Sequence, residues 1–192
     1  VMGGLWLALW NGRVRWLGLL PVTIGGGLVA LNQPSDILVS GDGRHVAFVS
    51  GSEDALFLLR NSRSGFVKDN LTEAVGMDGE PRSITTWPGA RCNAHACVLT
   101  IRQNDREWSV LATRTSAHVP ERALAATCER VDIVLSDRRL PQSCQPRWLK
   151  AARRLLEKTG GLAINLREGR TVTVAQSQGQ HGWWRAASSD HW

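Results

Sequence analysis

The most constraining feature of this chain is an apolar run over residues 16–31 that contains no charged side chain. A second apolar segment, residues 1–10, precedes it, and the turn-forming and basic residues 11–15 join the two. A membrane-spanning helix needs about 20 mostly apolar residues because the hydrocarbon core is about 30 Å thick, and this run is slightly shorter. Pro21 and the three glycines at 25–27 weaken a helix in water but are better tolerated in a membrane.

We therefore expect residues 1–33 to form a transmembrane helical hairpin, the end of a polytopic membrane region whose upstream part is missing from this chain. Arg13 and Arg15 lie in the short loop, and basic residues of short loops stay on the cytoplasmic side, so the rest of the chain should face the exterior. Two alternatives stay open. One is a secretory signal peptide, although an apolar segment precedes the arginines, and the other is a buried hairpin of a soluble protein.

The four cysteines fall into a close pair, Cys92 and Cys97, and a spaced pair, Cys128 and Cys144. An exterior domain would lie in an oxidising compartment, where an even number of cysteines favours disulfides. Four cysteines allow three connectivities, and the short loop favours closure between Cys92 and Cys97. Zinc is the alternative, with His95 lying inside that loop, but neither Cys128 nor Cys144 has a nearby Cys or His as a second ligand.

A basic segment follows in the second half of the chain, which has a formal net charge of +6. Its cations are Arg138, Arg139, Arg147, Lys150, Arg153, Arg154 and Lys158. A cationic cluster on an exterior domain can meet nucleic-acid phosphates or anionic lipid head groups, and the alternative is a solvated helix face. Near the end of the chain, Trp183 and Trp184 could stack on exposed bases together with His181 and Arg185, or dock the tail onto its domain.

The pattern of apolar residues predicts a mixed α/β domain over residues 34–180, followed by a weakly ordered tail over residues 181–192. Glycine-containing turns separate the first strands into a meander, and polar turns predict two later hairpins. The predicted strands cover residues 36–40, 43–49, 55–59, 97–101, 108–113, 131–135, 162–166 and 171–175. The predicted helices cover residues 119–128 and 146–157, and Gly160-Gly161 ends the second of them.

Several motifs occur in a specific combination and order. After the two apolar segments and their arginine-rich turn come Gly41-Asp-Gly-Arg-His-Val-Ala47, Trp87-Pro-Gly-Ala-Arg-Cys-Asn-Ala-His-Ala-Cys97, Val131-Asp-Ile-Val-Leu-Ser-Asp-Arg-Arg-Leu-Pro141, Cys144 and Pro146-Arg-Trp-Leu149. Together they resemble the C-terminal end of the ComEC/Rec2 family of competence proteins, which are polytopic inner-membrane channels for single-stranded DNA. The resemblance covers nearly the whole chain and implies a bacterial inner-membrane location with the domain on the periplasmic side.

Many members of that family end in a metallo-β-lactamase-like α/β sandwich that binds metal through clustered His and Asp. This chain has no His-x-His-x-Asp-His run, and its histidines occur singly at 45, 95, 118, 181 and 191. By resemblance, Arg114-Thr115 stands where active relatives have a Gly-Asp turn, and residues 136–139 stand where they have His-His-Gly-Ser. The expectation is a degenerate metallo-β-lactamase-like domain without metal or cofactor. Asp42, Asp132 and Asp137 then cap turns or pair with arginines.

The sequence therefore favours a non-catalytic exterior domain of a DNA-uptake channel that guides DNA through its basic segment. The partners implied are single-stranded DNA, the lipid bilayer, other proteins of the competence machinery and a second copy of the chain. Two alternatives stay open: a metal-dependent hydrolase or nuclease whose ligands are unrecognised, and a purely structural domain that closes the outer face of the channel.

Overall fold

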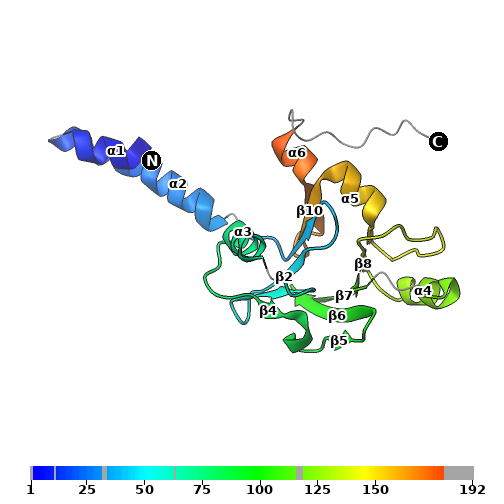
Figure 1. The fold of residues 1–192 in the computed structure, drawn as a ribbon. Coiled ribbons are helices and arrows are strands. Elements are labelled where there is room, and N and C mark those ends of the chain that lie inside the picture. Colours follow the sequence, from blue (N-terminus) through cyan, green and yellow to red (C-terminus); the bar gives the residue numbers. More distant parts are fainter. Residues whose placement is uncertain (1, 11, 32–33, 63, 116–118, 180–192) are drawn as a thin grey trace. The chain divides into compact units, whose positions relative to one another are not determined.

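The structure, a computed structural model, describes residues 2–10, 12–31, 34–62, 64–115 and 119–179 (Figure 1). The chain divides into two compact units, Val1–Pro34 and Ser35–Trp192. The first unit consists of helix α1 (Met2–Leu9), the 3-10 helix η1 (Arg13–Gly18) and helix α2 (Leu19–Leu31). The Trp6 and Trp10 rings stack with centroids 4.8 Å apart, and Trp6 Nε1 donates a hydrogen bond to the Val14 carbonyl at 3.2 Å.

The predicted transmembrane hairpin over residues 1–33 is wrong. Within the described parts of the chain, no helix combines the length and the apolar character that crossing a bilayer requires. The 3-10 segment η1 separates the two α-helices, and α2 has only 13 residues. At a rise of 1.5 Å per residue, such a helix covers about 20 Å of a hydrocarbon layer that is about 30 Å thick.

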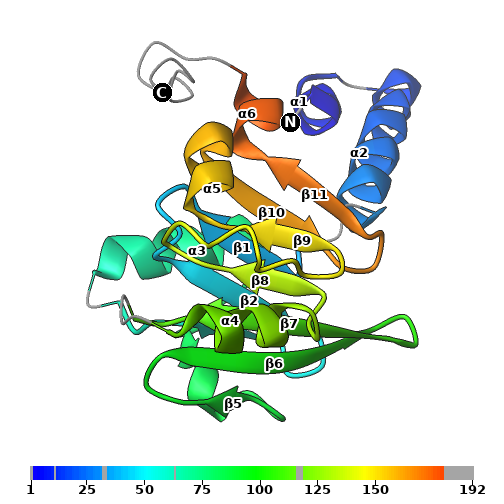
Figure 2. The same cartoon turned by 90° about the vertical axis from the view of Figure 1, so that its right-hand side faces the viewer.

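The second unit is built on two β-sheets (Figure 2). The first sheet has the strand order β11-β10-β1-β2-β3-β4, antiparallel except for the β3–β4 pair. Its strands are β1 (Ile37–Ser40), β2 (Val46–Ser50), β3 (Ala55–Leu58), β4 (Arg82–Ser83), β10 (Gly161–Asn165) and β11 (Arg170–Thr173).

The second sheet has the strand order β5-β6-β7-β8-β9, in which β7, β8 and β9 run parallel. Its strands are β5 (Arg91–Cys92), β6 (Ala96–Gln103), β7 (Arg106–Thr113), β8 (Ile133–Leu135) and β9 (Leu149–Ala151). The two longest strands form the predicted hairpin. Asn104 and Asp105 turn between them with φ angles of 48° and 59°, a left-handed conformation that Asn and Asp adopt more readily than most residues.

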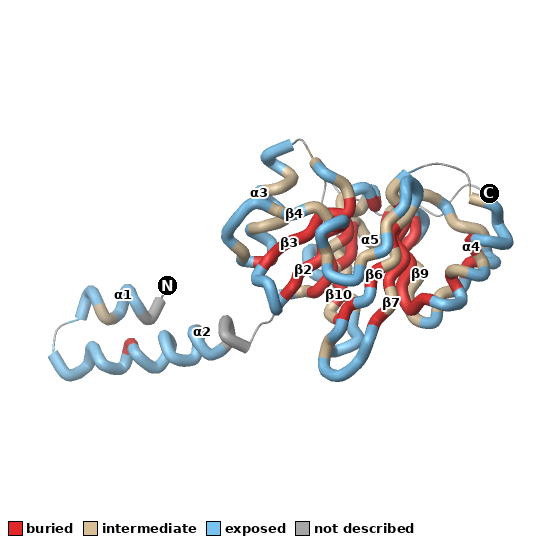
Figure 3. The backbone as a smooth tube through the Cα atoms, turned by 90° about the horizontal axis from the view of Figure 1, so that it is seen from below, coloured by how far each residue is buried: buried red, intermediate tan, exposed pale blue. Residues whose placement is uncertain are grey.

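The core lies between the two sheets, which pack face to face. Alternate residues of the first sheet, such as Phe48 and Phe57, are fully buried against alternate residues of the second, such as Leu99, Val110 and Ile133. Strand residues point to opposite faces in turn, so a strand with one apolar set buries that set in the sandwich. Figure 3 shows the resulting concentration of buried backbone in the strands of this unit.

Helices cover the outer faces of the sheets and one side of the sandwich. Helix α3 (Gly65–Val75) buries Val75 against the outer side chains of β2 and β3, and helix α4 (Glu121–Cys128) buries Leu124 against those of β7 and β8. Helix α5 (Arg153–Thr159) inserts Leu156 into the core between the sheets, and Gly160 ends it at φ 72°. The short helix α6 (Val174–Gln178) follows β11 and starts with a capping box formed by Thr173 and Gln176.

The mixed α/β prediction is confirmed, and most predicted strands lie within a residue or two of their expected positions. The helix predicted over residues 146–157 is wrong at its start. Residues 149–151 form β9 beside β8, and the helix begins only at Arg153. On this parallel strand Ala151 is fully buried and Leu149 packs against the core, and Trp148 just before it packs on Trp108 with ring centroids 4.8 Å apart. Helices α3 and α6 were not predicted, and the tail over residues 181–192 lies outside the described residues.

Gly43 supplies a test of how tightly the two sheets approach each other. It has φ +68°, and an added Cβ would lie 2.8 Å from both Asp137 Cα and Leu156 Cδ1. Gly43→Ala should lower the free energy of unfolding by about 2 kcal/mol or more, because it combines left-handed strain with overpacking. Urea unfolding measures the loss. Gly51→Ala is the matched control, since no atom lies within 4 Å of its Cβ position, and equal effects of the two variants would contradict this packing.

Candidate nucleic-acid interface

Three loops of the second sheet converge at one edge of the domain. Strands β7 and β8 are parallel, with Ala112 opposite Leu135, so the residues that follow them emerge side by side. The Thr113 hydroxyl donates to Ser136 Oγ at 3.0 Å. The tip of the β5–β6 hairpin reaches the same edge, because the Arg114 amide donates to the His95 carbonyl at 2.8 Å. We call this side of the sandwich, where Thr113, Arg114 and Ser136 meet the hairpin tip at His95, the arginine edge.

Arg60, which lies just beyond β3 in the first sheet, bridges to the second sheet at the arginine edge. Its Nε donates to the Arg114 carbonyl at 2.7 Å, and its Nη2 donates to the Thr113 carbonyl at 3.0 Å. Nη2 also lies 2.9 Å from Asp137 Oδ2, and the two side chains are 24% and 18% exposed. One partly buried guanidinium therefore neutralises the carboxylate that follows β8 and satisfies the carbonyls that end β7.

A cleft of about 530 Å³ opens beside this bridge. Residues from the β1–β2 turn, the loop after β8 and helix α5 line it: Gly41, Asp42, Arg44, Asp137, Arg138, Arg153 and Glu157. Three of these side chains are guanidiniums and three are carboxylates. The cleft itself is therefore close to neutral, and any net positive charge at this edge comes from cations around it.

The β1–β2 turn is organised by Asp42. Its carboxylate accepts hydrogen bonds from the Ser40 hydroxyl and from the Arg44 amide, the latter at 2.9 Å. Partial burial alone would raise the pKa of Asp42, but these two hydrogen bonds and the electrostatic interactions with His45 and Arg44 outweigh burial and lower it. Asp42 is thus the ionised cap of a turn that holds Arg44 at the cleft.

Helix α5 places two consecutive arginines at the arginine edge. The Arg153 amide donates to the Arg138 carbonyl at 3.3 Å, which ties the start of α5 to the loop after β8. Arg153 Nε pairs with Glu157 Oε1 at 2.7 Å, one helical turn later. The hydrogen bond and charge of Glu157 raise the pKa of Arg153 above its ordinary value. Arg154 points into solvent beside this pair, with Lys158 one turn away on the same face of the helix.

The structure divides the predicted basic segment into two groups. Arg138, Arg139, Arg153, Arg154 and Lys158 lie at the arginine edge or on the helix that starts there. The other two cations lie elsewhere. The Arg147 amide bonds to the Val131 carbonyl, which places Arg147 at the opposite end of β8, 4.0 Å from Asp132. Lys150 donates to the Pro141 carbonyl at 2.7 Å, and desolvation lowers its pKa.

Arg44 and Arg60 are site residues that sequence reasoning missed. Both belong to the first sheet, more than 75 positions before Arg138, so sequence proximity gave no reason to group them with the basic segment. A weak signal existed for each. Arg44 is part of the Gly41-Asp-Gly-Arg motif, and Arg60 is a cation placed directly after an apolar strand.

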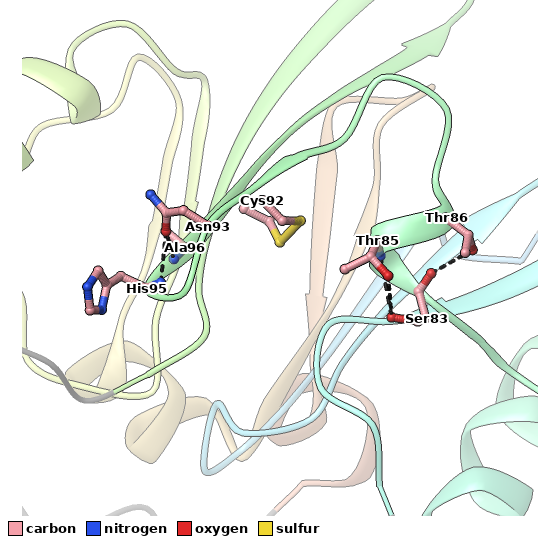
Figure 4. Close-up of a disulfide and its surroundings, with 8 residues drawn as sticks. Ser83, Thr85, Thr86, Cys92, Asn93, His95 and Ala96 are labelled. Atoms are coloured by element: carbon pink, nitrogen blue, oxygen red, sulfur yellow. Dashed lines mark hydrogen bonds between the residues drawn. A yellow bond between two sulfur atoms is a disulfide. The ribbon is translucent and has the colours of Figure 1, made fainter.

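Two disulfides are formed, and the expected closure between Cys92 and Cys97 is one of them. Cys92 and Cys97 lie directly opposite each other on β5 and β6 and are bonded at 2.01 Å (Figure 4). Asn93 shapes the tip between them, because its Oδ1 accepts from the amides of His95 and Ala96, both at 2.8 Å. In the structure both sulfurs of this pair are bonded to each other, which leaves no thiolate of the pair as a zinc ligand.

The second bond, Cys128 to Cys144 at 2.03 Å, ties the end of α4 to the loop after β8 and is fully buried. It closes a longer segment than the first bond, with 16 residues of separation against 5. In the chain-entropy description, closing a loop of about 15 residues contributes about 3 kcal/mol. The disulfide therefore holds the loop that leads from the arginine edge to β9.

The carboxylates that the sequence left open have structural partners. Asp132 Oδ2 accepts from the Ser109 amide at 2.8 Å and from the Ser109 hydroxyl at 2.7 Å, while Asp42 and Asp137 are engaged as described above. Across the described ranges, no three side chains of His, Cys, Asp or Glu gather where they could hold a metal ion. His118, His181, Trp183, Trp184, Arg185 and His191 lie outside the described residues.

Comparisons with known protein families, with curated proteins and with solved structures find no match for this chain.

Removing the Arg60 guanidinium tests whether this bridge holds the two sheets together. Arg60→Met should lower the free energy of unfolding by about 2–4 kcal/mol, because it leaves the Asp137 carboxylate and two carbonyls partly buried without their donor. Arg82→Met is the control, since Arg82 pairs with Glu53 while 56% exposed and should cost less than about 1 kcal/mol. Chemical denaturation measures both, and a loss for Arg60→Met no larger than the control would contradict the bridging role.

The lowered pKa of Asp42 gives a pH-dependent prediction. The folded state holds this carboxylate ionised more strongly than the unfolded chain does, so its stabilisation is present above the ordinary carboxyl pKa of about 3.9 and is lost as pH falls through the lower folded value. Wild type should therefore be more stable than Asp42→Asn at pH 6, and the difference should shrink below about pH 4. Thermal unfolding of both proteins between pH 2.5 and pH 6 checks this, and a constant difference would contradict it.

Proposed function

We propose that this chain is a non-catalytic, DNA-holding part of a DNA-uptake protein of the ComEC/Rec2 type, and that its arginine edge contacts the phosphate backbone of single-stranded DNA. The observation that carries the proposal is the set of exposed cations at this edge. Arg139, Arg154 and Lys158 are exposed and form no ion pair with a carboxylate among the described residues.

The charges around the arginine edge suit a phosphate chain. The cleft is near neutral, whereas the exposed cations surround it from two elements, the loop after β8 and helix α5. Backbone phosphates bind such surfaces by releasing condensed counterions, and the binding needs no base readout. A channel for arbitrary DNA requires binding that does not depend on the base sequence, and phosphate binding of this kind is sensitive to salt.

The disulfides support the proposed exterior location. Two bonds, one on a hairpin and one buried behind the arginine edge, are typical of a domain that matures in an oxidising compartment. The sandwich of two sheets with helices outside is the layering that the family resemblance implies. At the edge where that resemblance places metal ligands, the chain has Arg114 and Asp137, both bonded to Arg60.

The experiment is a titration of the 192-residue chain with a fluorescent single-stranded oligonucleotide at several salt concentrations. Substitution of Arg139, Arg154 and Lys158 by Gln should weaken binding about tenfold at 50 mM salt and reduce the salt slope by about 2, since each lost phosphate contact removes about 0.7. The control variant changes Arg106, Arg130 and Arg147 to Gln, which removes the same charge from exposed positions at the opposite ends of β7 and β8.

Two results would contradict the proposal. The first is binding that weakens equally in both variants, because the arginine edge would then contribute only net charge. The second is cleavage of DNA by the chain that stops on addition of a chelator, because that activity belongs to the metal-dependent hydrolase alternative.

A further inference from the structure

A second cleft, of about 490 Å³, lies at the edge of the sandwich opposite the arginine edge. It opens between the sheets, where the turn after β2 faces the end of β6, and the loop after the 3-10 helix η2 (Ile84–Thr86) closes one side. Its polar and aromatic lining consists of Ser50, Ser52, Trp87, Thr100, Arg102, Gln103 and Arg167. This volume is within the range of pockets that bury a small ligand.

The aromatic wall of this cleft is held in place by the core. Trp87 is half-buried, and its Nε1 donates to the Thr100 carbonyl at 3.4 Å. The Phe57 ring packs on it edge to face, with ring centroids 5.0 Å apart at an interplanar angle of 76°. An indole fixed by a buried phenyl ring loses little further freedom when a ligand stacks against it, which is the condition for strong stacking.

The charge of this cleft differs from that of the cleft at the arginine edge. Two guanidiniums, Arg102 and Arg167, line it, and none of its lining residues is acidic. Arg102 pairs with Glu107, which does not line the cleft, at 2.6 Å, and its side chain stays 82% exposed. The hydroxyls of Ser50, Ser52 and Thr100 add neutral donors and acceptors. The cleft thus combines a planar apolar wall with cationic donors.

We propose that this cleft binds a single nucleotide, with the base against Trp87 and the phosphate between Arg102 and Arg167. A nucleotide is the ligand class that joins a planar aromatic ring to an anion over the width of such a cleft, and base stacking with arginine contacts is how proteins hold nucleotides without reading sequence. The site uses no residue of the arginine edge. Nucleotide binding at this cleft can therefore be tested independently of DNA binding at the arginine edge.

The test is isothermal titration of the 192-residue chain with thymidine 5′-monophosphate, with thymidine and inorganic phosphate as separate arms. The mononucleotide should bind at least about tenfold more tightly than either fragment, because only the mononucleotide contacts both Trp87 and the two arginines. Trp87→Leu should weaken its binding about tenfold, and Arg167→Gln about fivefold. Arg170→Gln is the matched control, since Arg170 lies on the same β10–β11 hairpin, pairs with Glu168 and does not line the cleft.

Circular dichroism first establishes that each variant is folded. If Trp87→Leu does not fold, Arg102→Gln and Arg167→Gln decide the question. Absence of mononucleotide binding at millimolar concentration would overturn the proposal. Binding that Arg167→Gln and Arg170→Gln change equally would also overturn it, as would phosphate binding as tight as that of the mononucleotide. Each of these results leaves the oligonucleotide titration at the arginine edge unaffected.

Discussion

Burial of Phe48 and Phe57 against the inner face of the second sheet fixes the two sheets of this domain face to face. Fully burying a side chain of this size contributes about 1.5–3 kcal/mol, and more than a dozen apolar side chains share the layer. The layer leaves the sheets open at two edges, where strands end and loops begin. Both candidate sites lie at these edges, so the core determines where function can be placed and how rigidly each site is held.

Different kinds of side chain connect and line the two edges. At one edge Arg60 crosses between the sheets, and the cleft beside it has as many carboxylates as guanidiniums. At the other edge Trp87 packs on Phe57, and the lining has arginines but no acid. In the proposed role, phosphates at the first edge would meet scattered exposed cations around a near-neutral cleft, which suits a chain that moves along the surface. A ligand at the second edge meets a preorganised aromatic wall, which suits one bound unit.

Local sequence signals predicted the elements that depend on local physics. The β6–β7 hairpin follows from two alternating runs around Asn104 and Asp105, and the end of α5 follows from Gly160. Strand β9 depends instead on a parallel partner, β8, with Ile133 opposite Leu149, and the same apolar residues fit a helical period. The N-terminal hairpin was predicted from hydropathy and from the basic turn at residues 11–15, and neither signal shows that a 3-10 segment interrupts the helices.

The arginine edge could be predicted only in part, because its two halves come from different sheets. The basic segment was visible in sequence, but Arg60 became part of the site only through the packing of β3 against the ends of β7 and β8. Its role also bears on the chemistry of this edge. A metal site needs several converging anionic or neutral ligands with an open position. Here a fixed guanidinium already donates to the Asp137 carboxylate and to the Arg114 carbonyl, so an added cation would have to displace it against charge repulsion. The same bridge keeps the loops after β7 and β8 at a fixed spacing, so that Arg139 is presented to solvent by a rigid support.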